Sequence, residues 1–435
     1  MTATAPTDPA KGPATAAKTA FETLSTRFGA VATGAVASLI IARALGPEGR
    51  GEYVYPIFVV GLFAVAGHLS YDFINIHLRS IKAADERTLA LAAFAISGVA
   101  GLATLAVFAT VALTVPALFA GIHGKLVLAA AATLPLLIQQ HALTSVLVVS
   151  FRMRAVNAAT LAGAVAQLLA IIALAALGRL TPLGVLCVAA ASTAITWGVL
   201  FGAVRPPVGL PPAYLVRHAL RYAWRIHIGG IIMVLMWRGD VLFVKGFLGV
   251  REVGLYTLAV FLAEMLLSLV EATTVAATPR QVLSEAPDQF AGAVHRLGIM
   301  TLTAGGLALA AISPVLVPML YGSAFSDTIT PLLILLPGLV LFGAYRPLAV
   351  FLLRLQRPLR FTGAAAIALV VNVVGNLLVV ERWGIEGVAA ITSVTYAVLY
   401  LLIAAWFLAE TKLPWRTLIP SAADGRLLFS LLRRA

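Results

Sequence analysis

The residues best suited to chemistry are a few arginines placed inside long apolar stretches. Arg27, Arg238 and Arg346 each lie within such a stretch, where an arginine costs about 2.5–3.5 kcal/mol on membrane-insertion scales. A planar guanidinium group can bind two oxygens of one phosphate, so all three are candidate binders of a phosphate-bearing substrate. The alternative is that each pairs with a nearby carboxylate or extends toward the membrane surface.

A fourth candidate belongs to a row of basic residues. Arg217, Arg221 and Arg225 recur at four-residue spacing, which places them on one face of a helix. We interpret Arg217 and Arg221 as membrane-surface anchors. Arg225 is the deepest of the three, and we expect it to join the phosphate-binding group.

Ionisable side chains that could bind a coupling ion also occur within the apolar stretches. They are His68, Asp72, Asp240, Glu264 and Glu271. His68 and Asp72 are four residues apart, so one helix would present both on the same face. Such groups could take up H⁺ or bind Na⁺, since one charge crossing 100 mV supplies about 2.3 kcal/mol. The alternative is a buried ion pair with an arginine.

The elements that must position these residues are membrane-spanning helices. The chain has 435 residues, 61% of them apolar and 11% charged, whereas soluble domains have about 25% charged residues. This composition excludes a soluble multidomain enzyme, and the single cysteine, Cys187, excludes a disulfide scaffold. We therefore predict an all-α polytopic membrane protein. Twelve stretches are long enough to cross a bilayer. They lie near residues 21–45, 54–77, 88–115, 126–149, 155–178, 182–204, 222–247, 255–278, 297–320, 329–353, 359–380 and 386–409.

The basic residues orient these spans. The net charge is +13, and most of the 31 Lys and Arg fall in the two tails and in alternate loops. Positive loops remain in the cytoplasm, so both termini should be cytoplasmic. Because the basic residues lie between apolar spans, they indicate contact with an anionic leaflet rather than with nucleic acid.

An internal repeat divides the chain into two halves. At a constant offset of 203 residues, Leu45, Gly46, Gly51 and Tyr53 match Leu248, Gly249, Gly254 and Tyr256. The repeat therefore predicts two six-helix bundles that have the same orientation and are related by a pseudo-twofold axis along the membrane normal. The predicted domains are a tail (1–20), a first bundle (21–204), a proline-rich cytoplasmic linker (205–216), a second bundle (217–409) and a basic tail (410–435).

Several motifs, in this order and spacing, resemble those of Wzx-type polysaccharide flippases. They are the run from Ile41 to Tyr53, Arg238-Gly239-Asp240, the run from Glu252 to Tyr256, and Trp383-Gly384-Ile385-Glu386-Gly387-Val388. These flippases belong to the multidrug/oligosaccharidyl-lipid/polysaccharide (MOP) exporter superfamily.

The resemblance implies a V-shaped pair of lobes around a cationic cavity. It implies transfer of an undecaprenyl-pyrophosphate-linked oligosaccharide across the bacterial inner membrane, with a polysaccharide polymerase and glycosyltransferases as partners. The lipid II branch usually has two further helices, for which this chain has no room. A cation-coupled multidrug exporter of the same superfamily is the alternative.

The sequence indicates no cofactor. The segment Gly121-Ile122-His123-Gly124-Lys125 lacks the spacing of a phosphate-binding P-loop, and the histidines have no metal-ligand spacing. The predicted outer loops are too short to hold a catalytic domain. A membrane glycan polymerase is therefore the least favoured of the three hypotheses.

Overall fold

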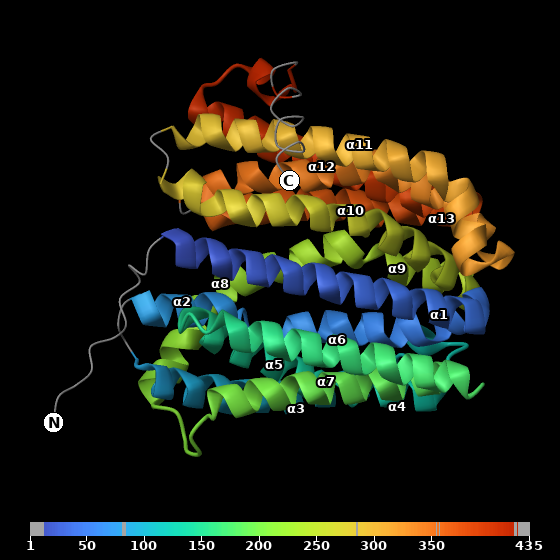
Figure 1. The fold of residues 1–435 in the computed structure, drawn as a ribbon, viewed down its shortest axis with the longest axis horizontal. Coiled ribbons are helices and arrows are strands. Elements are labelled where there is room, and N and C mark those ends of the chain that lie inside the picture. Colours follow the sequence, from blue (N-terminus) through green and yellow to red (C-terminus); the bar gives the residue numbers. More distant parts are fainter. Residues whose placement is uncertain are drawn as a thin grey trace.

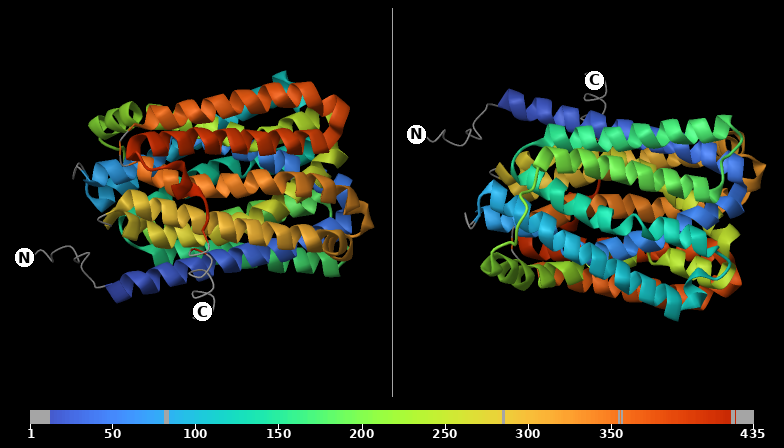
Figure 2. Two further views of the ribbon diagram at one scale, coloured as in Figure 1. Left: turned by 90° about the horizontal axis from the view of Figure 1, so that it is seen from above. Right: turned by 90° about the horizontal axis from the view of Figure 1, so that it is seen from below.

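The computed structural model describes residues 13–80, 84–283, 286–353, 355, 357–421 and 424, and this part of the chain contains helices but no strands. The helices lie side by side along one long axis in all three views (Figures 1 and 2). A helix satisfies its own backbone hydrogen bonds, which an apolar bilayer cannot do. The fold thus has the form that a membrane requires.

The first half of the chain forms one group of packed helices. The elements are α1 (Pro13–Gly67), α2 (Tyr71–Ser80), α3 (Glu86–Thr114), η1 (Pro116–Phe119), α4 (Gly124–Ala131), α5 (Leu134–Val149), α6 (Met153–Ala176) and α7 (Pro182–Val204). Polar residues in the connecting segments define some of the helix starts. Asp85 accepts a hydrogen bond from the backbone N–H of Thr88 at 2.9 Å, and Thr181 accepts one from Gly184 at 3.1 Å.

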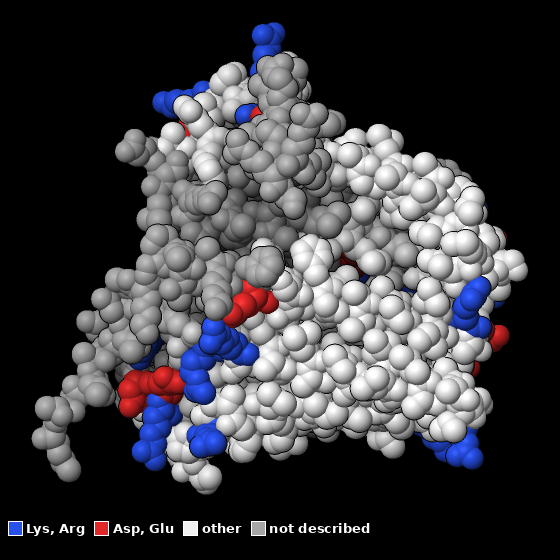
Figure 3. Space-filling model, in the orientation of Figure 1, with Lys and Arg blue, Asp and Glu red and all other residues white. Residues whose placement is uncertain are grey.

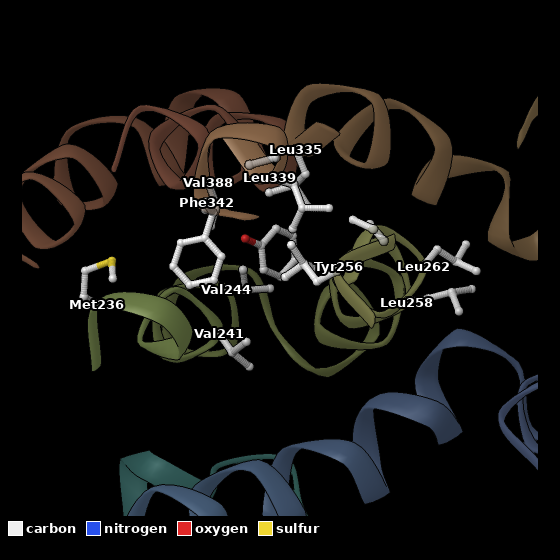
Figure 4. Packing of buried hydrophobic residues seen from close by; sticks show 14 of the residues in the cluster. Met236, Val241, Val244, Tyr256, Leu258, Leu262, Leu335, Leu339, Phe342 and Val388 are labelled. Carbon is white, nitrogen blue, oxygen red and sulfur yellow. The ribbon is translucent and has the colours of Figure 1, made fainter. Parts of the chain in front are cut away.

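The second half forms another group. Its elements are α8 (Ala213–Arg238), α9 (Asp240–Phe243), η2 (Val244–Leu248), α10 (Val250–Leu283), α11 (Pro287–Tyr321), η3 (Ser323–Thr328), α12 (Ile329–Leu353), α13 (Pro358–Thr411) and η4 (Trp415–Leu418). Helix α12 packs between α11 and α13. Figure 4 shows part of the core, where Tyr256 of α10 points away from α1 toward Leu339, Phe342 and Val388.

Among the described residues, eight helices are long and apolar enough to cross a membrane. Two of them, Glu22–Gly67 with 46 residues and Leu359–Thr411 with 53, have more than twice the roughly 20 residues of one crossing. Charged side chains gather at the two ends of the bundle, and the belt between them is nearly free of charge on the face in Figure 3. This distribution fits a multi-pass membrane protein.

Both long helices bend at a glycine. In α1 the bend is at Gly46 (φ 66°), and in α13 it is at Gly384 (φ 55°). A positive φ is strained for residues that carry a Cβ, so glycine allows the chain to reverse with almost no loop. Gly249, which is 203 residues after Gly46, also has a positive φ of 106° and precedes α10. The repeat seen in the sequence therefore appears in the backbone.

One predicted span is interrupted by two non-glycine residues with positive φ. The stretch predicted near residues 54–77 is helical to Gly67, and a new helix starts at Tyr71. Between them Leu69 and Ser70 have φ values of 53° and 50°. The helical-spacing argument that placed His68 and Asp72 on one face is therefore wrong, because the residues between them are not helical.

Candidate functional site

A cavity of about 440 Å³ lies between the two halves, which pack together along α1 and α10. Its walls are mostly apolar and come from the second part of α1, from α8 and α9, and from α10. Three charged side chains line it, those of Arg50, Arg238 and Glu264. From Arg50 to Val65, the lining residues of α1 span 15 residues, or about 22 Å of helix.

Arg238 and Glu264 form an ion pair inside this cavity. The Nη2 atom of Arg238 donates to Oε2 of Glu264 at 2.7 Å, and the side chains are 34% and 17% exposed. The Arg238 guanidinium also lies 4.5 Å from the centre of the Trp237 ring. The other carboxylate oxygen of Glu264, Oε1, is buried and has no hydrogen-bond partner in the described part of the chain. The pair thus carries little net charge but retains one free acceptor.

Asp240 lies next to the cavity but faces into the second half. It is 3% exposed and accepts hydrogen bonds from the Tyr256 hydroxyl, the Thr392 hydroxyl at 2.9 Å and the backbone N–H of Val241 at 2.9 Å. Figure 4 shows the neighbouring Val241 pointing instead toward α1. Arg238 and Asp240 therefore face different ways, as their two-residue spacing predicts.

The chain around Asp240 is irregular. Helix α8 ends at Arg238, and the short α9 passes into a π-helical turn at Val244–Leu248. Such turns often mark functional sites within helices. The irregular turn follows Asp240 along the chain, at the end of α9.

At one end of the cavity the two halves touch through glycines. A Cβ atom built on Gly51 would overlap the carbonyl oxygen of Val250, and one on Gly254 would overlap that of Pro47. Pro47 and Val250, like Gly51 and Gly254, are 203 residues apart. We call this symmetric pair of contacts the glycine seal. It lies at the end that the sequence predicts to be outer, and only glycine fits there.

Near the other end, three histidines from both halves meet. The ring of His68 lies 5.3 Å from that of His141 in α5 and 5.7 Å from that of His227 in α8. The Nε2–H of His227 donates to the carbonyl oxygen of Ala66 at 2.8 Å, and its Nδ1 lies 3.3 Å from the Ser70 hydroxyl. The described residues include no group of His, Cys, Asp or Glu that could hold a metal ion. His68 thus forms part of a contact between the halves.

The remaining predicted residues lie elsewhere. Arg27 lines a separate cavity of about 270 Å³ between α1, α6 and α10, and Arg346 of α12 stacks 5.7 Å from the Phe342 ring. Neither lines the central cavity. The side chains of Arg225, Asp72 and Glu271 lie outside the described residues.

Arg50 is a cavity residue that the sequence does not predict. The sequence places it in a short outer loop, where an arginine is common. The structure places it in the first turn after the Gly46 bend, buried at the cavity end. One signal was available, because the repeat pairs Arg50 with Val253 and so marks a charge present in one half alone.

No family model and no curated protein matches this sequence. Solved structures do match it in fold. The lipid II flippase MurJ in an inward closed conformation aligns with a TM-score of 0.75 at 13% identity, over 90% of this chain and 88% of that one. A multidrug resistance MATE transporter of the MOP superfamily, in an outward-facing conformation, aligns at 0.63 and 13% identity, over 90% and 95%. The MATE transporter VcmN of Vibrio cholerae aligns at 0.63 and 15% identity, over 91% and 96%. The chain thus has the fold shared by transporters of the MOP superfamily.

Proposed function

We propose that this protein is a flippase that moves an undecaprenyl-pyrophosphate-linked oligosaccharide across the bacterial inner membrane for surface polysaccharide synthesis. The observation that carries the proposal is the cavity between the two halves, which combines two arginines with a largely apolar wall. A charged headgroup cannot cross bare hydrocarbon, and such a cavity offers it cations. The isoprenoid tail would remain in the lipid.

The proposed mechanism is alternating access. Twelve crossings, with both termini cytoplasmic, would place the glycine seal at the outer face and the histidine contact toward the inner face. In the described state the halves touch at both of these places. Opening the inner contact would admit the headgroup, and parting the glycine seal would release it outside. A polymerase would then consume the repeat unit that glycosyltransferases supply.

The fold comparisons support a transporter of this kind. The match to the lipid II flippase MurJ has a higher TM-score than the matches to the two MATE transporters. Shared fold does not fix a substrate, so the proposal depends on the charged cavity.

The test is a clean deletion strain from which pyrophosphate-linked oligosaccharides are extracted. The leaflet that holds them is assigned by their accessibility to a periplasmic glycosidase. We expect completed repeat units to accumulate on the cytoplasmic leaflet and surface polysaccharide to be lost. Normal polysaccharide without trapped intermediates, in a strain lacking other flippases, would refute the proposal. Units that reach the outer leaflet unpolymerised would indicate a polymerase.

A cation-coupled multidrug exporter is the second candidate, and one observation favours it. The unpartnered Oε1 of Glu264 lies in the cavity wall and could accept a hydrogen bond from a cationic drug. This hypothesis predicts that Glu264→Gln abolishes resistance to lipophilic cations. The flippase hypothesis predicts that drug resistance of the deletion strain equals that of the parent.

A further inference from the structure

Arg50 is the one cavity-lining cation without a carboxylate partner among the described residues. It is 4% exposed, and its Nη1 donates to the Ser38 hydroxyl at 3.0 Å and to the Tyr53 hydroxyl at 3.5 Å. Its Nε is buried without an acceptor, and its Nη2 makes no hydrogen bond within the described part of the chain. By contrast, Glu264 pairs with Arg238. The uncompensated positive charge of the cavity therefore belongs to Arg50.

The free atoms of Arg50 form one edge of its guanidinium. Nε–H and one Nη2–H point in the same direction and can hold two oxygens of one anion. Elsewhere in this chain the same edge of Arg154 binds both carboxylate oxygens of Glu22, at 3.2 and 3.3 Å. A buried charge requires a compensating partner. Since the two hydroxyls that bind Nη1 are neutral, the described residues leave the charge of Arg50 uncompensated, and an anion from outside the protein would compensate it.

Arg50 also precedes the glycine seal by one residue. Gly51 touches Val250 directly, and Gly254 touches Pro47. An anion held by Arg50 would therefore lie beneath the contact that has to part before release to the outer side.

We propose that Arg50 is an anion-binding residue that holds a phosphate group of the substrate at the outer end of the cavity, beneath the glycine seal. This inference rests on the proposed function for the identity of the substrate, and it adds to that function a release site at the outer end of the cavity. The ligand chemistry is a phosphate or pyrophosphate dianion, which matches the planar fork of arginine.

Direct binding tests the proposal without any transport assay. Purified full-length protein in nanodiscs is titrated with inorganic pyrophosphate, and separately with undecaprenyl pyrophosphate, while thermal unfolding is followed. Both ligands should stabilise the wild type in a saturable way. Arg50→Gln should weaken binding by at least about tenfold, because a bidentate charged contact is lost. Saturation by undecaprenyl pyrophosphate alone would identify the lipid form as the ligand, and saturation by both would identify the phosphate groups.

Two controls separate binding from folding. Arg179→Gln removes an exposed arginine from the loop at the same end of the bundle, and it should change the affinity less than about twofold. The double variant Ser38→Ala/Tyr53→Phe removes the internal partners of Arg50 but keeps its charge, so it should still bind. Equal losses in Arg179→Gln, a loss in the double variant as large as in Arg50→Gln, or no saturable binding by the wild type would overturn the proposal.

The result of this binding test can be distinguished from the result of the deletion-strain test of the proposed function. If pyrophosphate binding depends on Arg50 but the deletion strain traps no intermediate, the anion site stands and the flippase hypothesis fails. If intermediates are trapped but Arg50→Gln binds both ligands normally, only the role of Arg50 fails.

Discussion

Arg238 and Glu264 share a cavity wall and neutralise each other across a 2.7 Å contact. The sequence leaves open whether each of these side chains binds a ligand or forms an ion pair, and the structure shows the ion pair. The sequence places both residues in apolar spans, where an ion pair is one of the two interpretations. Residues 26 positions apart on different helices can be paired only when the packing of those helices is known. The sequence therefore predicts the members of the pair but not the pair.

The Arg238–Glu264 pair should contribute to stability. Arg238→Gln and Glu264→Gln should each cost about 1–3 kcal/mol, because each leaves a partly buried charge without its partner. The double variant should cost less than the sum of the two. Thermal unfolding in detergent measures this, and a double variant with strictly additive loss would contradict it. The matched control is Asp327→Asn, which breaks the exposed pair with Arg251 (64% and 51% exposed) and should cost under about 1 kcal/mol.

We propose Asp240 as the coupling carboxylate. Asp240→Asn keeps a side chain of the same shape beside the Tyr256 and Thr392 hydroxyls, so the variant should fold. It cannot exchange a proton or neutralise a cation, and transport into proteoliposomes should lose its dependence on an H⁺ or Na⁺ gradient. Tyr256→Phe removes one hydrogen bond and should retain that dependence while unfolding at a lower temperature. Unchanged gradient dependence in Asp240→Asn would exclude it as the coupling group.

At the scale of elements, hydrophobic length predicts the helices well and their interruptions poorly. The predicted stretches near 88–115, 155–178 and 182–204 agree closely with α3, α6 and α7. The break at His68–Ser70 directly follows Gly67, the last residue of α1, but a single glycine inside an apolar stretch is a weak signal that does not by itself predict a break. Leu69 and Ser70 adopt positive φ values where neighbouring helices hold the chain, through contacts such as Ser70 with His227. Such tertiary contacts are invisible in a single sequence.

The glycine seal predicts that a larger residue at position 254 will keep the outer end of the cavity open. Gly254→Ala adds a Cβ where the carbonyl oxygen of Pro47 lies, so the outer end of the cavity should fail to close. In a Cys187→Ser background, Val54→Cys places a thiol in the cavity wall near that end. A membrane-impermeant maleimide added outside should label this thiol in the Gly254→Ala variant and spare it when Gly254 is intact. The control is Gly34→Ala, since a Cβ there meets nothing within 4 Å. Equal labelling with and without the Gly254→Ala substitution would contradict a seal.

The basic residues predict how the whole molecule is oriented in the membrane, and that orientation can be measured. A green fluorescent protein fused after residue 435 should fluoresce, and alkaline phosphatase at the same point should be inactive, because the C-terminus is predicted to be cytoplasmic. Alkaline phosphatase inserted after Gly121, in the short connection between η1 and α4, should be active. The reverse pattern would place the glycine seal on the cytoplasmic side.

The symmetry of the glycine seal bears on the origin of the chain. Each half offers the same loop to the other, Pro47 to Gly254 and Val250 to Gly51, as the identical subunits of a twofold homodimer do. We infer that the seal preserves the interface of an ancestral dimer whose genes fused, and that the segment Arg205–Pro212 serves as a tether. Cut there, the two fragments should reassemble when expressed together. Recovery of polysaccharide synthesis by the paired fragments, but by neither one alone, would show it.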